Sequence, residues 1–398
     1  MRSGLIMLCL AYVLSQFFRA FLAVLGAPLE ADIGADASDL AFASGLWFLT
    51  FAAMQLPVGW ALDRIGPRRT ASALLLLGGG GGALLFAVAA SALHVSLAMA
   101  FIGIGCAPIL MASCYIFARQ FPVAQFATLA AVMLGVGSVG NLVASYPMAL
   151  AVEAVGWRAT MVGLAVLLAL VALGLAVWVH DPEPVTDGAR GSVLDLLRMR
   201  ALWPIFPLMF VAYAPAAAIR WLWIGPYLTD IYGLSTAQVG QASLIMGLAM
   251  IVGTLLYGPL DRLFGTQKWV CLVGGLLTGA ATLALAGTVG QGVGLAIALC
   301  ALVGLFGATF PVMIAHARGF FPAHLAGRGV TLMNLFGIGG VGVMQFGSAP
   351  LHSAALAVSG QGDAAAYTAL FGFFGAAVLI GALIYLFSRD APSARPLS

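Results

Sequence analysis

The sequence has little charge: Asp, Glu, Lys and Arg make up 8% of its 398 residues, whereas 62% are hydrophobic. About a quarter of the residues of an ordinary soluble domain are charged, so this chain lacks the polar surface that water solubility requires. Apolar runs of about 20 residues, long enough to cross a bilayer as helices, recur along the whole length. The runs are continuous and do not alternate, which excludes a membrane barrel. The composition predicts an all-α membrane protein.

Signatures of cofactor, metal and nucleotide chemistry are also lacking. The five cysteines fall within apolar runs and form no C-x-x-C pair, so neither a disulfide framework nor a metal site is predicted. Two G-x-G-x-x-G strings, at 135–140 and 337–342, lie inside apolar runs without the strand that dinucleotide binding requires. We interpret these glycines as close helix contacts. We therefore expect no enzymatic activity, no catalytic residues, no cofactor and no nucleic-acid partner.

Twelve membrane spans can be placed along the chain. They lie at roughly 4–28, 40–62, 70–90, 93–117, 125–149, 157–180, 202–229, 237–260, 268–288, 291–316, 325–349 and 366–387. The first has no small-residue cleavage site at its end, so we expect it to be retained and not removed as a signal peptide. The prediction is an N-terminal six-helix half (1–180), a cytoplasmic linker (181–201) and a C-terminal six-helix half (202–398).

The few basic residues are distributed unevenly over the connections. Of the 17 Lys and Arg residues, 14 lie in one alternating set of loops and termini, and only Arg158 lies in the other set, among acidic residues. The positive-inside rule places the first set in the cytoplasm. We therefore expect both termini to be cytoplasmic and the protein to be a multi-pass protein of a bacterial cytoplasmic (inner) membrane.

The two halves repeat each other. Tyr12 and Arg19 of span one recur as Tyr213 and Arg220 of span seven, both 201 residues later. Further matches pair Pro28 with Pro226, Asp32 with Asp230, and the glycines 135, 137 and 140 with 337, 339 and 342. Spans one and seven start on the same side, so the halves are parallel repeats. In membrane proteins built from such repeats, a substrate binds near the membrane midplane, between the two halves.

A charged string follows span two. Its fixed positions are Gly59, Asp63, Arg64, Gly66, Arg68 and Arg69. A partial copy after span eight keeps Asp261 and Arg262 but has Thr266-Gln267-Lys268 where the arginine pair would stand. The string resembles the G-x-x-x-D-R-x-G-R-R loop of the major facilitator superfamily, and with the 6+6 repeat the resemblance covers essentially the whole chain.

This resemblance implies the major facilitator fold and a role for both loops as a conformational latch. We carry that role over to Gly59, Asp63, Arg64, Gly66, Arg68, Arg69, Asp261 and Arg262. Carboxylate and guanidinium groups in such a loop can make charge-assisted hydrogen bonds to helix ends and neighbouring loops. The second copy lacks the arginine pair, so we expect it to be the weaker latch.

Two arginines lie inside apolar runs, where an ionisable group is costly and marks a functional site. In a continuous helix, Tyr12, Gln16 and Arg19 would share one face. No Asp or Glu falls in the middle of any span, and the planar guanidinium group suits a carboxylate or phosphate. Superfamily members that carry such anions place an arginine in spans one and seven, which this sequence resembles. The predicted substrate-binding residues are Arg19, Arg220, Tyr12, Gln16, Tyr213 and Asn141.

A different interpretation of the arginines stays open at this point. Each could pair with an acid of its own half, such as Glu30 or Asp32, or bind carbonyl groups at helix ends. Four tryptophans near predicted span ends, Trp47, Trp157, Trp203 and Trp269, are interpreted as an aromatic belt at the membrane surface.

The sequence thus predicts a monomeric secondary active transporter that moves a small organic anion, a carboxylate or phosphate ester, by alternating access. It leaves open whether a proton or another ion is co-transported or anions are exchanged. One alternative is a multidrug or metabolite exporter, although family exporters often carry proline where Asn141 follows Gly140. Another is a non-transporting receptor, which would normally add a soluble signalling domain.

Overall fold

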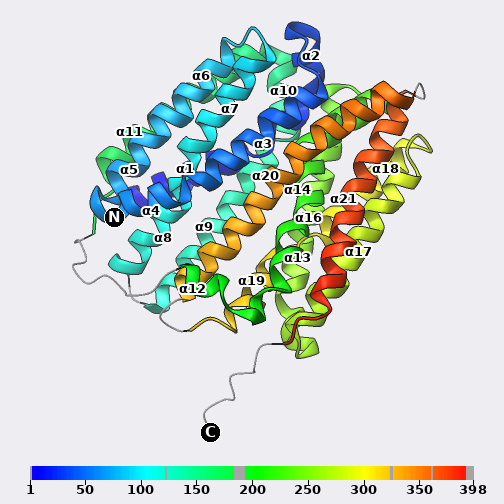
Figure 1. Cartoon of the computed structure of the whole chain (residues 1–398). Coiled ribbons are helices and arrows are strands. Elements are labelled where there is room, and N and C mark those ends of the chain that lie inside the picture. The colour runs from blue at the N-terminus through cyan, green and yellow to red at the C-terminus, as the bar shows by residue number, and fades with distance from the viewer. Residues whose placement is uncertain (1, 122, 183–192, 323–325, 360–361, 391–398) are drawn as a thin grey trace. The chain divides into compact units, whose positions relative to one another are not determined.

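The computed structural model describes residues 2–121, 123–182, 193–322, 326–359 and 362–390, and the regular structure within these ranges is helical (Figure 1). The side chains of Asp63, Asp261 and Arg262 lie outside the described residues. The linker contributes two short elements, α12 (Val193–Leu197) and η3 (Arg200–Leu202).

Each of the first six spans is one helix or a short series of helices. They are α1 (Arg2–Phe17) with η1 (Phe21–Val24) and α2 (Gly26–Ile33); α3 (Ala37–Ala53) with α4 (Gln55–Arg64); α5 (Pro67–Leu74) with η2 (Leu75–Gly80) and α6 (Gly81–Ala87); α7 (Ala92–Cys106) with α8 (Pro108–Gln120); α9 (Val123–Val143) with α10 (Tyr146–Val155); and α11 (Trp157–Trp178).

The last six spans follow the same plan. They are α13 (Ile205–Val211) with α14 (Ala214–Ala218), η4 (Ile219–Trp223) and α15 (Ile224–Tyr232); α16 (Thr236–Phe264); α17 (Gln267–Gly287); α18 (Val293–Phe306) with α19 (Phe310–Arg318); α20 (Ala326–Ser359); and α21 (Asp363–Tyr385).

The described residues contain ten helices long and apolar enough to cross a membrane. Helices α9 and α10 add an eleventh span, bent by 41°. The twelfth is span one, whose first helix is short because the span is interrupted after Phe17. The chain is therefore an all-α membrane protein with twelve spans in two parallel six-helix repeats, as the sequence predicted.

The loops that follow spans one and seven show why the repeats fold alike. Helices α2 and α15 both end at a glycine with positive φ, Gly34 at 66° and Gly233 at 67°, a conformation that glycine adopts without strain. Two residues later Asp36 exchanges hydrogen bonds with Asp39 at the start of α3. Ser235 and Gln238 exchange similar bonds at the start of α16. These reciprocal bonds satisfy helix-start donors.

Close glycine contacts also repeat between the halves. A Cβ atom on Gly140 of α9 would collide with the carbonyl oxygen of Val13 in α1, and one on Gly340 of α20 would collide with that of Phe210 in α13. Span five thus packs on span one as span eleven packs on span seven. The sequence paired Gly140 with Gly342, whereas the comparable contact in the second half is made by Gly340. The interpretation of these glycines as packing residues is confirmed for Gly137, Gly140, Gly337 and Gly340, but it is wrong for Gly135 and Gly339, since no atom lies within 4 Å of the position that a Cβ would take.

The chain packs as two compact units: residues 1–187 with 221–244, and residues 188–220 with 245–398. The first unit therefore contains the outer part of span seven and the start of span eight. Trp221 stacks on Phe48 at 5.4 Å between ring centroids, and the hydroxyls of Ser145 and Ser243 lie 3.2 Å apart. The division at the 181–201 linker stays a prediction.

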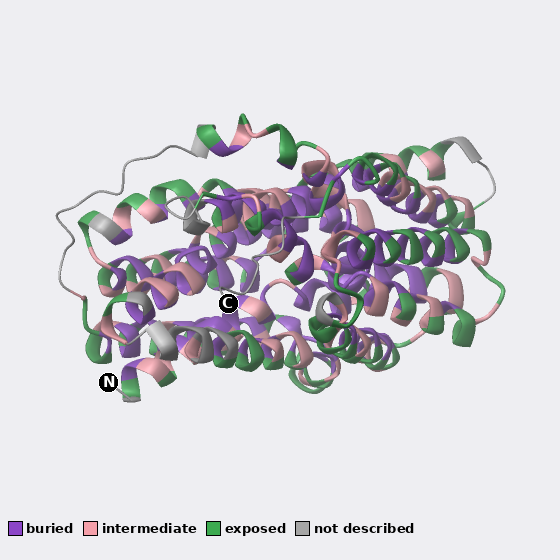
Figure 2. Cartoon of the chain, turned by 90° about the horizontal axis from the view of Figure 1, so that it is seen from below, coloured by how far each residue is buried: buried purple, intermediate pink, exposed green. Residues whose placement is uncertain are grey.

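Burial separates the lipid-facing side chains from the packed ones (Figure 2). Many leucines and valines are exposed on the outer faces of the spans, where lipid would contact them. Trp203 and Trp269 are also exposed, as expected of an aromatic belt. Trp47 is 0% exposed, and Trp157 is buried too. The belt interpretation is therefore wrong for these two residues, which pack inside the first unit.

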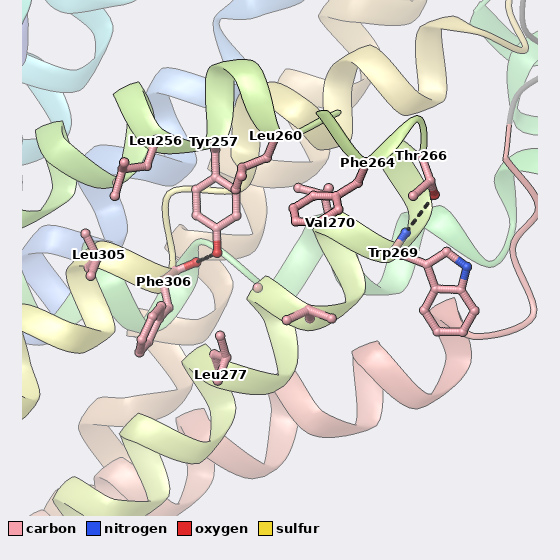
Figure 3. Close-up of a pocket in the computed structure, with 13 residues that line it drawn as sticks. Leu256, Tyr257, Leu260, Phe264, Thr266, Trp269, Val270, Leu277, Leu305 and Phe306 are labelled. Carbon is pink, nitrogen blue, oxygen red and sulfur yellow. Dashed lines mark hydrogen bonds between the residues drawn. The ribbon is translucent and has the colours of Figure 1, made fainter. Parts of the chain in front are cut away.

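Helices α16, α17 and α18 of the second unit line a cavity of about 480 Å³ (Figure 3). Tyr257 forms part of its wall, and its hydroxyl donates a 3.1 Å hydrogen bond to the carbonyl oxygen of Phe306. The rest of the wall consists mainly of leucine, valine, phenylalanine and tryptophan side chains.

An aspartate that follows span twelve caps the start of span nine. The Asp390 carboxylate accepts hydrogen bonds from the Thr266 hydroxyl at 2.6 Å and from the backbone nitrogens of Gln267 and Lys268 at 3.0 and 2.8 Å. Backbone donors at a helix start have no partner within the helix, and the helix dipole favours a negative charge there. Although burial by itself raises the pKa of Asp390, the bonds from Thr266 and Lys268 outweigh it and hold the pKa below its usual value.

We expect Asp390→Asn to lower thermal stability at neutral pH, by roughly the 0.5–2 kcal/mol that a helix cap contributes. The pKa of Asp390 is lower in the folded protein than in the unfolded chain. Its carboxylate therefore stabilises the folded state in full at any pH above the unfolded-state pKa, and this stabilisation is lost as the pH falls through the folded-state pKa. Thermal unfolding of both proteins in detergent should show a difference that shrinks in acid. An unchanged difference in acid would contradict the capping role, and Thr266→Val should reproduce part of the effect.

The glycine contacts generate a second prediction. Gly140→Ala places a methyl group against the Val13 carbonyl, and overpacking of this kind costs about 1–3 kcal/mol. Gly135→Ala is the matched control on the same helix, because no atom lies within 4 Å of the position that its Cβ would take. Thermal unfolding should show a loss for Gly140→Ala alone, and equal behaviour of the two variants would contradict the contact.

Candidate functional site

Arg19 lies in a break of span one. Helix α1 ends at Phe17, and the backbone nitrogen of Arg19 bonds to the carbonyl oxygen of Gln16 at 3.3 Å in a tight turn before η1. The expectation of one continuous helix through Tyr12, Gln16 and Arg19 was therefore wrong beyond Phe17. Tyr12 and Gln16 do lie together, because the Gln16 amide donates a 3.0 Å hydrogen bond to the Tyr12 hydroxyl.

The Arg19 guanidinium group is surrounded by aromatic rings. Its central carbon lies 5.4 Å from the ring centroid of Trp47 and 5.0 Å from that of Phe51, and these two rings stack on each other. A ring face attracts a cation, so Trp47 and Phe51 hold the guanidinium group without neutralising it. Sequence reasoning missed both residues, since nothing in the one-dimensional pattern distinguishes them from other span aromatics.

Several polar atoms around Arg19 are buried without a partner. Within the part of the chain that the structure describes, Arg19 Nε, Gln16 Oε1 and Trp47 Nε1 accept or donate no hydrogen bond, and Arg19 makes no ion pair there. Buried polar groups are nearly always hydrogen-bonded, and leaving one unsatisfied costs about 1–3 kcal/mol. These three atoms could therefore hydrogen-bond a polar ligand.

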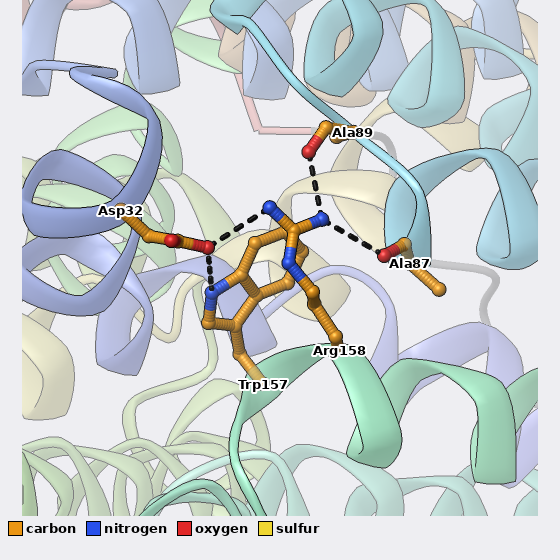
Figure 4. A network of polar contacts seen from close by, with 5 residues as sticks. All are labelled: Asp32, Ala87, Ala89, Trp157 and Arg158. Carbon is orange, nitrogen blue, oxygen red and sulfur yellow. Dashed lines mark hydrogen bonds and ion pairs between the residues drawn. The ribbon is translucent and has the colours of Figure 1, made fainter.

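Asp32, one of the two acids considered as a partner for Arg19, is bound elsewhere (Figure 4). Asp32, in α2, forms a 2.9 Å ion pair with Arg158 and accepts a 3.2 Å hydrogen bond from the Trp157 indole nitrogen. Arg158 also donates to the carbonyl oxygens of Ala87 and Ala89 at 3.1 and 2.8 Å. The network joins the ends of α2, α6 and α11, and it assigns Asp32 to Arg158 in place of Arg19.

Arg220 is 2% exposed and lies in η4, a short π-helical segment. Its guanidinium group lies against Gly247 of α16, where a Cβ atom would fall 2.5 Å from Nη2 and 2.9 Å from the guanidinium carbon. Only glycine leaves room for it there. Tyr213, at the start of α14, is half-buried and its ring centroid lies 5.3 Å from that of Phe310. Single π-helical turns are frequent at functional sites.

Both arginines thus lie where their span departs from regular α-helix. Irregular backbone at membrane depth is tolerated where it is buried in protein or lines a water-filled cavity, and transporter sites are typically built at such interrupted helices. The sequence around Arg19 contains neither glycine nor proline between 17 and 25, so the usual signal of a break was missing.

Asn141 lies in α9, the helix that packs on α1. Its carbonyl oxygen accepts a 3.2 Å hydrogen bond from the Ser145 hydroxyl. One turn earlier, a Cβ atom on Gly137 would collide with the Tyr12 ring. The small residue at 137 therefore lets α9 approach the part of α1 that carries Tyr12 and Gln16.

The loop with the predicted latch residues is organised by Gly66 and Asp181. Gly66 has a φ of 100°, and a Cβ atom there would lie 2.8 Å from the Asp181 carboxyl group. Asp181, just after span six, accepts a 2.7 Å hydrogen bond from the backbone nitrogen of Arg68, as Asp390 does at Lys268. Arg64 and Arg69 are exposed, and Gly59 lies in α4 near Met111. The latch role stays a prediction.

Comparison with known proteins also indicates a transporter fold. The sequence profile of the Major Facilitator Superfamily matches residues 8–224. The structure is similar to a bacterial homologue of the human lysosomal transporter Spinster in an inward-facing, occupied conformation, with 17% identity, a TM-score of 0.77 and 96% coverage of each chain.

Two further solved structures are similar. A D-xylose–proton symporter is 16% identical, with a TM-score of 0.75 and 98% coverage of each chain. The nucleoside transporter NupG is 14% identical, with a TM-score of 0.76, 96% of this chain covered and 99% of that one. At these identities the likeness shows the fold alone. A comparison with curated protein sequences gives no match.

The network at Asp32 generates a testable prediction. A double-mutant cycle of Asp32→Asn and Arg158→Gln, measured by thermal unfolding, should give a coupling energy of about 0.2–1 kcal/mol, because both side chains are partly exposed. A cycle of Asp32→Asn and Arg19→Gln is the control and should give additive effects. Coupling between Asp32 and Arg19 would show that the acid neutralises the span arginine after all.

Proposed function

Because the chain belongs to the Major Facilitator Superfamily, we propose that it is a secondary active transporter of a small organic anion, a carboxylate or phosphate ester. It acts as a monomer by alternating access, in a bacterial inner membrane with both termini in the cytoplasm. Arg19 and Arg220 bind the anion. Their hydrogen-bonding neighbours in this proposal are Tyr12, Gln16, Tyr213 and Asn141.

The observation that carries the proposal is the environment of Arg19. An arginine side chain stays charged in proteins, and a charge within a span is costly unless it is paired. Arg19 makes no ion pair with any acid in the described residues, and Asp32, at the end of its own span, is bound to Arg158. An anionic substrate would neutralise the charge and satisfy Nε with a charge-assisted hydrogen bond.

Arg220 supports the same proposal from the second unit. It occupies the position in span seven that Arg19 occupies in span one, and it is almost fully buried against Gly247. The cost of burying a guanidinium group at two repeated positions is best explained by a shared function. Arginine binds carboxylate and phosphate groups through two parallel hydrogen bonds, which favours these two anion classes.

Alternating access would require the contacts between residues 221–244 and the N-terminal six spans, which together form the first unit, to open. A Cβ atom on Gly225 would collide with the Ala23 carbonyl, and Glu153 accepts a 2.9 Å hydrogen bond from the Ala237 backbone nitrogen. By the predicted topology these contacts lie on the outer side of the membrane.

The test is uptake and counterflow in proteoliposomes, with a panel of carboxylates and phosphate esters. Arg19→Gln and Arg220→Gln should each reduce transport about tenfold or more, since hydrogen bonds to charged groups contribute about 1.5–3 kcal/mol. Arg158→Gln is the matched control: it removes an arginine outside the proposed site and should keep transport. Normal transport by both span-arginine variants would refute the anion site.

The same liposomes distinguish the two coupling modes. Uptake driven by an imposed pH gradient without internal anion indicates proton symport, whereas uptake that requires internal anion indicates exchange. No Asp or Glu lies in the middle of a span, so a coupling proton would move with the substrate, on Glu30 or Glu153, or on a histidine.

A further inference from the structure

The cavity between α16, α17 and α18 opens to the side of the second unit. Leu256 of α16 is 54% exposed, Phe264 at the end of α16 is 65% exposed, and Val273 of α17 is 50% exposed, and all three line the cavity. Deeper in the wall, Tyr257 and Val270 are buried (Figure 3). Leu256 and Val273 belong to membrane spans, so the cavity faces the bilayer where these two residues lie.

The chemistry of the wall selects an apolar occupant. Its two hydroxyl groups are already engaged: Tyr257 donates to the Phe306 carbonyl oxygen, and Thr266 donates to Asp390 while accepting from the Trp269 backbone nitrogen. The remaining lining is hydrocarbon and aromatic surface. A volume of about 480 Å³ is within the range of small-molecule sites. A flexible lipid acyl chain matches this shape and polarity.

Charge at one end of the cavity indicates the headgroup. Lys268 lies next to the cavity-lining Trp269, with its ammonium nitrogen 5.3 Å from the indole centroid. Arg389 is exposed beside Asp390, and the Asp390 carboxylate is occupied by three hydrogen bonds to the start of α17. A tryptophan and a lysine together are typical of the membrane surface, and such basic residues attract anionic lipid headgroups of the cytoplasmic leaflet.

We propose that this cavity binds one anionic phospholipid. An acyl chain lies between α16 and α17 against Leu256, Tyr257 and Val273, and the phosphate-bearing headgroup lies at Lys268. The site belongs to the second unit alone and does not depend on which substrate the protein transports. Bilayer acyl chains are as apolar as the cavity wall, so the lipid is held by van der Waals packing in the cavity and by the charge at Lys268. A chain packed in this way exchanges more slowly than lipid on the outer faces of the helices.

The test is photo-crosslinking of the full-length protein in phosphatidylcholine nanodiscs. These contain a small fraction of phosphatidylglycerol with a diazirine in its acyl chain, and crosslinked peptides are mapped by mass spectrometry. Crosslinks should concentrate on residues 253–277. Leu256→Trp puts a larger side chain into the cavity and should reduce them about tenfold, which corresponds to a loss of about 1.4 kcal/mol of binding free energy. Leu255→Trp is the matched control: Leu255 is 71% exposed on the same helix, outside the cavity lining, and it should leave crosslinking unchanged.

The headgroup is tested separately. Diazirine phosphatidylcholine should crosslink less in the cavity than the phosphatidylglycerol probe, and Lys268→Gln should remove that difference while Lys268→Arg preserves it. Crosslinks spread evenly over all lipid-facing helices, or unaffected by Leu256→Trp, would overturn the site. Equal labelling by both probes in the unaltered protein would overturn the anionic selectivity.

Discussion

The bilayer interior offers no water to hydrogen-bond a polar group, and most of this structure satisfies that constraint internally. Thr50 donates to the Ala100 carbonyl oxygen across two spans, and Thr278 and Thr282 bond to carbonyl groups of their own helix. Small residues bring backbones together where no polar group is needed, as at Gly140 and Gly340. Against this background, the buried and unsatisfied Nε of Arg19 is one of several exceptions among the described residues, and a charged group within a span is the kind of exception where function is expected.

The two halves of the chain satisfy this constraint with the same kinds of contact. The glycine stops at Gly34 and Gly233, the reciprocal caps that follow them and the glycine contacts of spans five and eleven occur at equivalent places. Asp181 and Asp390 cap the third helix of each half from the end of the sixth. Independent contacts repeat in this way when both halves have the same six-helix fold, which is why Arg19 and Arg220 are comparable positions.

Much of this architecture was predictable because it depends on composition and period. Span number, the repeat and the packing role of the glycines follow from long apolar runs and matched spacings. The environment of Arg19 was not predictable, because it depends on contacts between distant segments. Trp47 and Phe51 come from span two, and Asp32 forms an ion pair with Arg158 of span six. The break after Phe17 was also missed, since no glycine or proline marks it.

The two arginines share a position in the repeat but not a neighbourhood. Arg19 lies over the rings of Trp47 and Phe51, whereas Arg220 lies against Gly247, with no side chain between the guanidinium group and the backbone. An aromatic face holds a cation while leaving its edge nitrogens accessible to an acceptor, and a glycine lets the whole group sink into the helix packing. The repeat therefore supplies two similar charges with different surroundings. In the proposed anion site the two arginines are therefore not interchangeable.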